Sequence, residues 1–102
     1  MPPVTDNGGR YEVCCAATIA KTIKRLQGRA NKQGRGKRFL QALRTIGRRL
    51  TYEPSELGEA LYQLPALRMQ VRHVVVAPLI VYFGVCEDRS LVFIKRVDLL
   101  NE

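Results

Sequence analysis

The spacing of the apolar residues changes between residues 50 and 60, and this change restricts the folds open to the chain. Between residues 16 and 50 the apolar side chains recur every three or four positions, which is the period of an α-helix. Between residues 60 and 98 they alternate or run together, which is typical of β-strands. Helices followed by a series of strands indicate an α+β domain, in which the helices cover one face of a sheet.

Two helices are expected in the first half of the chain. Their apolar stripes are Ile19, Ile23, Leu26 and Ala30 in the first helix and Phe39, Leu43, Ile46 and Leu50 in the second. The segment NKQGRG, residues 31–36, contains two glycines and predicts the turn between two antiparallel helices. A short β-prone segment, residues 10–15, predicts a strand before the first helix.

Three or four further strands are expected after residue 58. The candidates are residues 60–64, 69–77, 79–86 and 91–98. Their connections are short, so neighbouring strands are expected to be antiparallel. Because residues 79–85 are almost all apolar, this strand is predicted to lie in the middle of the sheet.

The 102 residues fit a single domain, which we place at residues 10–102. Residues 1–9 contain two prolines and a glycine pair and are predicted to form a flexible lead-in. The longest apolar stretch, residues 74–86, is too short for a membrane-spanning helix and contains Pro78, and no signal-like segment precedes it. We therefore expect a soluble cytoplasmic protein without a membrane partner.

The cysteines predict neither a disulfide framework nor a metal site. Cys14 and Cys15 are adjacent and Cys86 is alone, so we expect all three to be reduced and to pack as small buried side chains. His73 is the only histidine, and no residues stand at the spacing of zinc ligands. Neither a metal nor another cofactor is expected.

Positive charge is concentrated in the helical half. Residues 1–50 carry a net charge of +10 and residues 51–102 one of −2, and no acidic residue lies between Glu12 and Glu53. Such a distribution attracts polyanions and acidic partners, although it also serves solubility. The candidate nucleic-acid or partner-binding residues are Lys21, Lys24, Arg25, Arg29, Lys37, Arg38, Arg44, Arg48 and Arg49 of the helices, with Arg68 before the second of the four later strands.

The order of these elements, the basic helix pair and the segment from Leu64 to Leu100 resemble the RelE/ParE superfamily of small toxins from toxin–antitoxin modules. The segment reads LP, ALR, QVR, an apolar run, PLIVYFGV, ED, S and LVFIKRV. In that family a helical hairpin precedes a strand that carries Arg, an aromatic-rich strand, an acidic turn and a last strand of Val, Ile and basic residues. The match covers residues 11–97. It implies an N-terminal strand and a basic helical hairpin packed on an antiparallel sheet of three or four further strands.

The resemblance leaves the activity open. RelE-like proteins cut messenger RNA in the ribosomal decoding site without a metal, whereas ParE-like proteins inhibit DNA gyrase. It implies a toxin-like protein of the plasmid-stabilisation type whose partner is an acidic antitoxin-like protein. A metal-independent endoribonuclease is therefore one alternative. The other is a gyrase inhibitor or a non-catalytic module that binds nucleic acid or protein.

The RelE-like alternative implies a cluster of cationic side chains with a proton-handling group. On this sequence Arg72 and Arg96 are the candidates for the phosphate, and His73 or Tyr82 for the proton. Because side chains alternate along a strand, Arg72 and His73 cannot both face the open side of the sheet. We predict Arg72 and Arg96 on neighbouring strands, each facing solvent, a carboxylate or an anion, since an unpaired buried guanidinium is costly. The structural alternative is a hydrogen-bonded, half-buried His73 and a Tyr82 that packs in the core or at the sheet edge.

The end of the sequence departs from the RelE-like pattern. Such nucleases usually carry a basic and aromatic segment after the last strand, whereas this sequence ends Leu99-Leu100-Asn101-Glu102. A terminal catalytic Arg or Tyr is therefore not expected.

Overall fold

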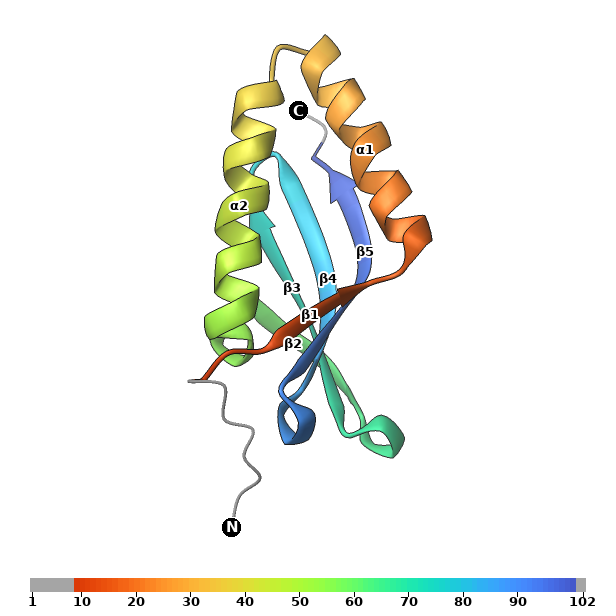
Figure 1. Cartoon of the computed structure of the whole chain (residues 1–102), viewed down its shortest axis with the longest axis vertical. Coiled ribbons are helices and arrows are strands. Elements are labelled where there is room, and N and C mark those ends of the chain that lie inside the picture. Colours follow the sequence, from red (N-terminus) through yellow and green to blue (C-terminus); the bar gives the residue numbers. More distant parts are fainter. Residues whose placement is uncertain (1–8, 101–102) are drawn as a thin grey trace.

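A computed structural model describes residues 9–100 of the chain, which form two helices and one five-stranded sheet (Figure 1). The helices are α1 (Ala17–Lys32) and α2 (Gly36–Tyr52). The strands are β1 (Glu12–Cys15), β2 (Glu59–Leu64), β3 (Met69–Val76), β4 (Leu79–Cys86) and β5 (Leu91–Leu99). Single 3-10 turns are η1 (Pro54–Glu56), η2 (Pro65–Leu67) and η3 (Glu87–Arg89). The α+β class and the predicted elements are confirmed, while the predicted lead-in lies outside the described residues apart from Gly9.

The sheet is mixed rather than purely antiparallel. Its order is β1-β5-β4-β3-β2, in which β2 to β5 are antiparallel neighbours and β1 runs parallel to β5. The central position of β4 was predicted from its apolar run and is confirmed. Since β1 and β2 are the two outermost strands, the helical hairpin between them carries the chain from one edge of the sheet to the other.

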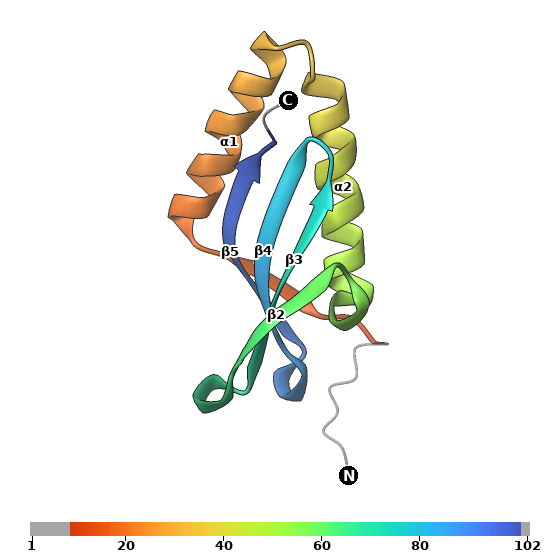
Figure 2. The same ribbon diagram turned by 180° about the vertical axis from the view of Figure 1, so that it is seen from behind.

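The helices and one face of the sheet enclose the apolar core. The buried helical side chains are Leu26, Ala30, Phe39, Ala42, Ile46 and Leu50. They meet the face of β4 that carries Val81, Phe83 and Val85, together with Val92 and Val97 of β5. Figure 2 views the molecule from the other face of the sheet, which neither helix covers and which we call the open face.

Two β-bulges interrupt the alternation of side chains. In β5 the register passes from Ile94, opposite Phe83, to Arg96, opposite Tyr82, and Lys95 between them has no partner. In β2 an equivalent shift falls at Leu61. Each bulge adds one residue and thereby exchanges the faces of everything beyond it. The open face therefore carries side chains that simple alternation would place on opposite sides.

The three cysteines are free, but only one behaves as a small core residue. Cys86 is buried, as expected, whereas Cys14 is half-buried and Cys15 is exposed, so the expectation of burial is wrong for Cys15. Cys15 is the last residue of the short edge strand β1, where no further strand covers it. Within residues 9–100 no helix has both the length and the apolar character needed to cross a membrane.

Candidate functional site

Four neighbouring strands each contribute one polar side chain to a line across the open face. Glu59 of β2 stands opposite His73 of β3, His73 opposite Tyr82 of β4, and Tyr82 opposite Arg96 of β5. We call these four residues the polar row. Cross-strand neighbours have their Cβ atoms about 5 Å apart, so side chains in such a line are in mutual contact.

Tyr82 is the centre of the polar row. The ring centroids of Tyr82 and His73 are 5.7 Å apart and their planes differ by 29°, which is a stacked arrangement. On the other side the guanidinium carbon of Arg96 lies 5.7 Å from the centroid of the Tyr82 ring, within the range of a cation–π interaction. The phenol ring thus holds an imidazole on one side and a guanidinium on the other.

The two nitrogens of His73 have different surroundings. Nδ1 is buried and has no hydrogen-bond partner among the described residues. Nε2 lies 3.9 Å from a carboxylate oxygen of Glu59, whose side chain is 82% exposed. The His73 side chain itself is 25% exposed. Nε2 is therefore the nitrogen that can exchange a proton with a ligand on the open face.

Arg96 presents its charge to solvent. Its Nε lies 2.8 Å from Oδ2 of Asp98, two residues further along β5, and its side chain is 68% exposed. No other acidic side chain of residues 9–100 forms an ion pair with it. The prediction that Arg96 faces solvent or a carboxylate is confirmed, and its outer nitrogens are placed to meet an anion beside the Tyr82 ring.

Arg72 lies on the opposite, helix-covered face and is buried. Its Nε donates to the carbonyl of Leu57 at 2.9 Å, Nη1 to Oε1 of Gln70 at 2.7 Å and Nη2 to the carbonyl of Gly58 at 3.1 Å. The prediction that Arg72 faces solvent, a carboxylate or an anion is wrong, because the segment after α2 supplies backbone carbonyls instead. The prediction that its strand neighbours that of Arg96 is also wrong, since β4 separates β3 from β5.

The basic residues of the helices form a separate surface. Eight of the nine predicted helical residues are exposed, and Arg49 is half-buried and paired with Glu53 at 2.9 Å. The apolar stripes of the same helices face the sheet, so these cations point away from it. They therefore lie on the side of the molecule opposite the polar row, and the fold does not bring the two predicted sets of residues together.

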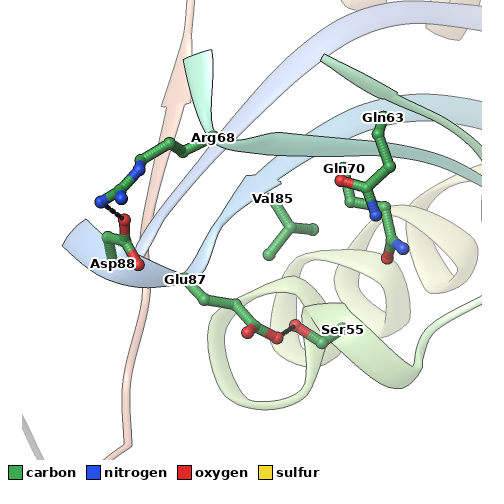
Figure 3. A pocket seen from close by; sticks show the side chains of 7 residues that line it. All are labelled: Ser55, Gln63, Arg68, Gln70, Val85, Glu87 and Asp88. Atoms are coloured by element: carbon green, nitrogen blue, oxygen red, sulfur yellow. Dashed lines mark hydrogen bonds and ion pairs between the residues drawn. The ribbon is translucent and has the colours of Figure 1, made fainter. Parts of the chain in front are cut away.

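Arg68, the remaining predicted binding residue, closes a contact between two turns. Its Nη1 lies 2.7 Å from Oδ2 of Asp88, and this ion pair joins the η2 and η3 turns at one end of the sheet (Figure 3). Arg68 ends the η2 turn in the left-handed conformation, with φ 54°, which aims it toward the neighbouring turn. The Arg68 side chain is nevertheless 77% exposed, so the ion pair does not remove its charge from the surface.

A hollow lies on each side of the Arg68–Asp88 ion pair. On the helix side a polar pocket of about 180 Å³ contains the Gln63 and Gln70 amides and a hydrogen bond of 2.6 Å from Ser55 to Glu87 (Figure 3). On the open face a wider groove has a volume of about 610 Å³. Neither hollow was predicted, because each is formed by turns that are distant in sequence.

Glu59 and Asp98 were not predicted to contact the residues of the polar row. Asp98 stands two residues after Arg96 on the same strand, so simple alternation places both on one face and was the signal that could have identified it. The pairing of Glu59 with His73 depends instead on the register of β2 and on its bulge at Leu61. No signal in a single sequence marks such a bulge. Among the described residues there is no group of three side chains that could hold a metal ion.

Comparison of the chain with protein-family models, with curated proteins and with solved structures gives no match. The resemblance to RelE/ParE toxins therefore stays a prediction.

Proposed function

We propose that this protein is a toxin-like component of a toxin–antitoxin module and that it cleaves ribosome-bound messenger RNA without a metal. The observation that supports the proposal is the polar row, in which His73 and Arg96 flank the Tyr82 ring on the open face. An imidazole and a guanidinium on one accessible surface are the two groups that phosphodiester cleavage by a neighbouring hydroxyl needs most.

The chemistry divides between these residues. The ribose 2′-OH attacks the adjacent phosphorus and gives its proton to Nε2 of His73, forming a 2′,3′-cyclic phosphate. The bond from phosphorus to the 5′ oxygen breaks, and water at this exposed surface protonates the departing oxygen. Arg96 neutralises the charge that builds on the non-bridging oxygens. Tyr82 positions both groups through its ring contacts, and Glu59 stabilises the protonated imidazole.

The basic helical surface has a different role in this proposal. It lies on the other side of the sheet and carries no acidic residues between Glu12 and Glu53. A surface of this kind attracts RNA over distances comparable to the Debye length and speeds encounter with the ribosome. Docking then occurs on the helices and cleavage on the open face.

An acidic antitoxin-like protein is the partner that the proposal requires. A free nuclease in the cell needs an inhibitor, and a chain with a formal net charge of +8 favours an acidic one. Such an inhibitor would neutralise the helical surface or the polar row.

A second candidate function is non-catalytic binding, including inhibition of DNA gyrase. It is favoured by the burial of Arg72, which leaves Arg96 as the only cation of the polar row. A single cation is a sparse active site, whereas the helical surface alone suffices for binding to a nucleic-acid machine.

The test is cleavage of ribosome-bound message by the purified chain. We expect His73→Gln and Arg96→Ala each to lower the cleavage rate about a hundredfold, because one removes the proton acceptor and the other the phosphate-binding cation. Lys32→Ala, an exposed helical substitution outside the predicted sets, is the control and should cleave like wild type. Circular dichroism establishes that all variants are folded.

Two outcomes would overturn the nuclease proposal. Equal cleavage by wild type and both variants would place the chemistry outside the polar row. Intact message with wild-type protein, together with loss of gyrase supercoiling in a parallel assay, would favour the second candidate.

A further inference from the structure

The groove on the open face has a distinct composition. It lies between the η2 and η3 turns, beside the polar row, and its volume of about 610 Å³ is that of a typical ligand site. Met69, Cys86 and Phe93 form its floor, and Leu67, Arg89 and Lys95 stand at its rim. These six residues come from three strands and two turns that only the fold brings together.

The floor of the groove is apolar. Met69 is 9% exposed and Cys86 is 5% exposed, and Phe93 is half-buried. Gly84 on the central strand makes room for the Met69 side chain, because a Cβ atom at that position would lie 2.2 Å from Sδ of Met69. The floor therefore offers no hydrogen-bond donor or acceptor of strength but accepts a large apolar side chain.

The rim of the groove carries positive charge that no residue of the described part of the chain neutralises. Arg89 and Lys95 are exposed, and neither forms an ion pair with an acidic residue among residues 9–100. Asp88, the acidic residue that also lines the groove, is engaged by Arg68 at 2.7 Å. A ligand with negative charge on either side of an apolar group matches this pattern.

We propose that the groove is the docking site for an acidic segment of a protein partner. One large apolar side chain of the segment lies over Phe93 and Met69, and flanking carboxylates meet Arg89 and Lys95. Leu67, which is 60% exposed, covers the apolar side chain from the rim. The inference rests on the proposal above that an acidic partner exists, and it adds where that partner binds.

The same observations disfavour RNA as the occupant. A nucleobase is recognised through hydrogen bonds to its edges or by stacking on an exposed aromatic face. The floor supplies no polar side chain, and its single ring, Phe93, is half-buried. A protein side chain such as Leu or Phe requires neither hydrogen bonds nor an exposed aromatic face for its burial.

The groove also connects to the polar row through the bulge in β5. Lys95 is at the rim of the groove, and the next residue, Arg96, belongs to the row. A segment seated in the groove therefore lies beside the residues proposed to cleave RNA. Binding of the acidic segment in the groove and cleavage of RNA at the polar row are therefore expected to exclude each other.

The test is a fluorescence-anisotropy titration of the full chain with a labelled short peptide of Glu and Asp around a central Leu-Phe pair. We expect saturable binding that weakens about tenfold or more in Lys95→Glu and in Leu67→Asp, because a like charge at the rim or a buried carboxylate opposes the peptide. The matched controls are Lys32→Glu on α1 and Leu61→Asp on β2, where Leu61 is 43% exposed and outside the groove. They should bind within about twofold of wild type.

Three results would overturn the docking proposal. The first is equal binding of a peptide in which Ser-Ser replaces Leu-Phe, and the second is an equal loss in Lys32→Glu; either would show attraction by net charge alone. The third is stronger binding of an oligouridylate that Lys95→Glu and Leu67→Asp abolish, which would make RNA the occupant. Peptide binding by a protein that does not cleave message would support the docking site and reject the nuclease proposal. Cleavage of message without peptide binding would reject only the docking site.

Discussion

At the scale of single residues, Arg72 shows how a charged side chain in an apolar strand can be structural. Its guanidinium donates hydrogen bonds to two backbone carbonyls and one amide oxygen, and thereby ties the segment after α2 to β3. The bond to Leu57 is buried, so removal of its donor leaves that carbonyl where water cannot replace it, whereas the bond to Gly58 is only partly buried. Arg72 accordingly holds the fold that positions the polar row rather than belonging to the row.

Replacing Arg72 should therefore affect stability before activity. We expect Arg72→Met to lower the free energy of unfolding by about 1–3 kcal/mol, chiefly because it leaves the buried carbonyl of Leu57 without its donor. Urea unfolding followed by circular dichroism measures the loss. Arg38→Met, an exposed guanidinium on α2, is the control and should change stability by about 0.5 kcal/mol or less. Equal stability of both variants would mean that water reaches the Leu57 carbonyl.

At the scale of elements, the bulge at Lys95 sets which residues of β5 face the helices. Ile94 and Val97 both pack toward the core although they are three residues apart, and Phe93 and Arg96 both reach the open face. Deleting Lys95 should restore simple alternation along β5. The side chains on one side of the deletion would then move to the opposite face of the sheet. We expect the deletion to destabilise the protein by about 3 kcal/mol or more, since it exposes apolar or buries charged side chains.

The matched variant for the deletion is Lys95→Ala, which keeps the residue count and hence the bulge. Its cost should be about 0.5 kcal/mol or less, because Lys95 is exposed. Urea unfolding midpoints compare the two. A deletion variant as stable as Lys95→Ala would show that the strand can shift its register without loss.

The elements themselves could be predicted because their signals are local. The stripe from Ile19 to Ala30 and the apolar run from residue 79 have the periods that helices and buried strands impose. The pairing of β1 with β5 could not be predicted, because it joins the two ends of the fold and leaves no local pattern. Of the candidate site, the strand residues His73, Tyr82 and Arg96 were identified, but their alignment depends on registers and bulges that alternation alone misplaces.

At the scale of the whole molecule, the basic helical surface and the polar row lie on opposite sides of one sheet. The helical surface should bind polyanions by releasing their counterions, so affinity for RNA should fall steeply with salt and depend little on sequence. We expect simultaneous neutralisation of Lys21, Lys24, Arg25 and Arg29 to make the slope of log affinity against log salt shallower. On single-stranded RNA the change should be about 0.7 for each phosphate that the variant no longer neutralises.

Filter binding or anisotropy across a salt series measures this slope for wild type and the fourfold variant. His73→Gln, on the other side of the sheet, is expected to leave the slope unaltered because it adds no charge near the helices. Affinity that does not respond to salt, or an unaltered slope in the fourfold variant, would leave solubility as the role of the helical charge.

The parallel pairing of β1 with β5 also determines when the sheet can be completed during synthesis of the protein. β1 leaves the ribosome before both helices and three strands. It stays unpaired until its partner β5, the last strand of the fold, has been synthesised. Contacts between segments so distant in sequence form late and slow the final folding step. Arg96 lies on that same last strand. A nascent chain therefore carries its imidazole and phenol without their cation, and the complete set of groups exists only after translation has passed β5.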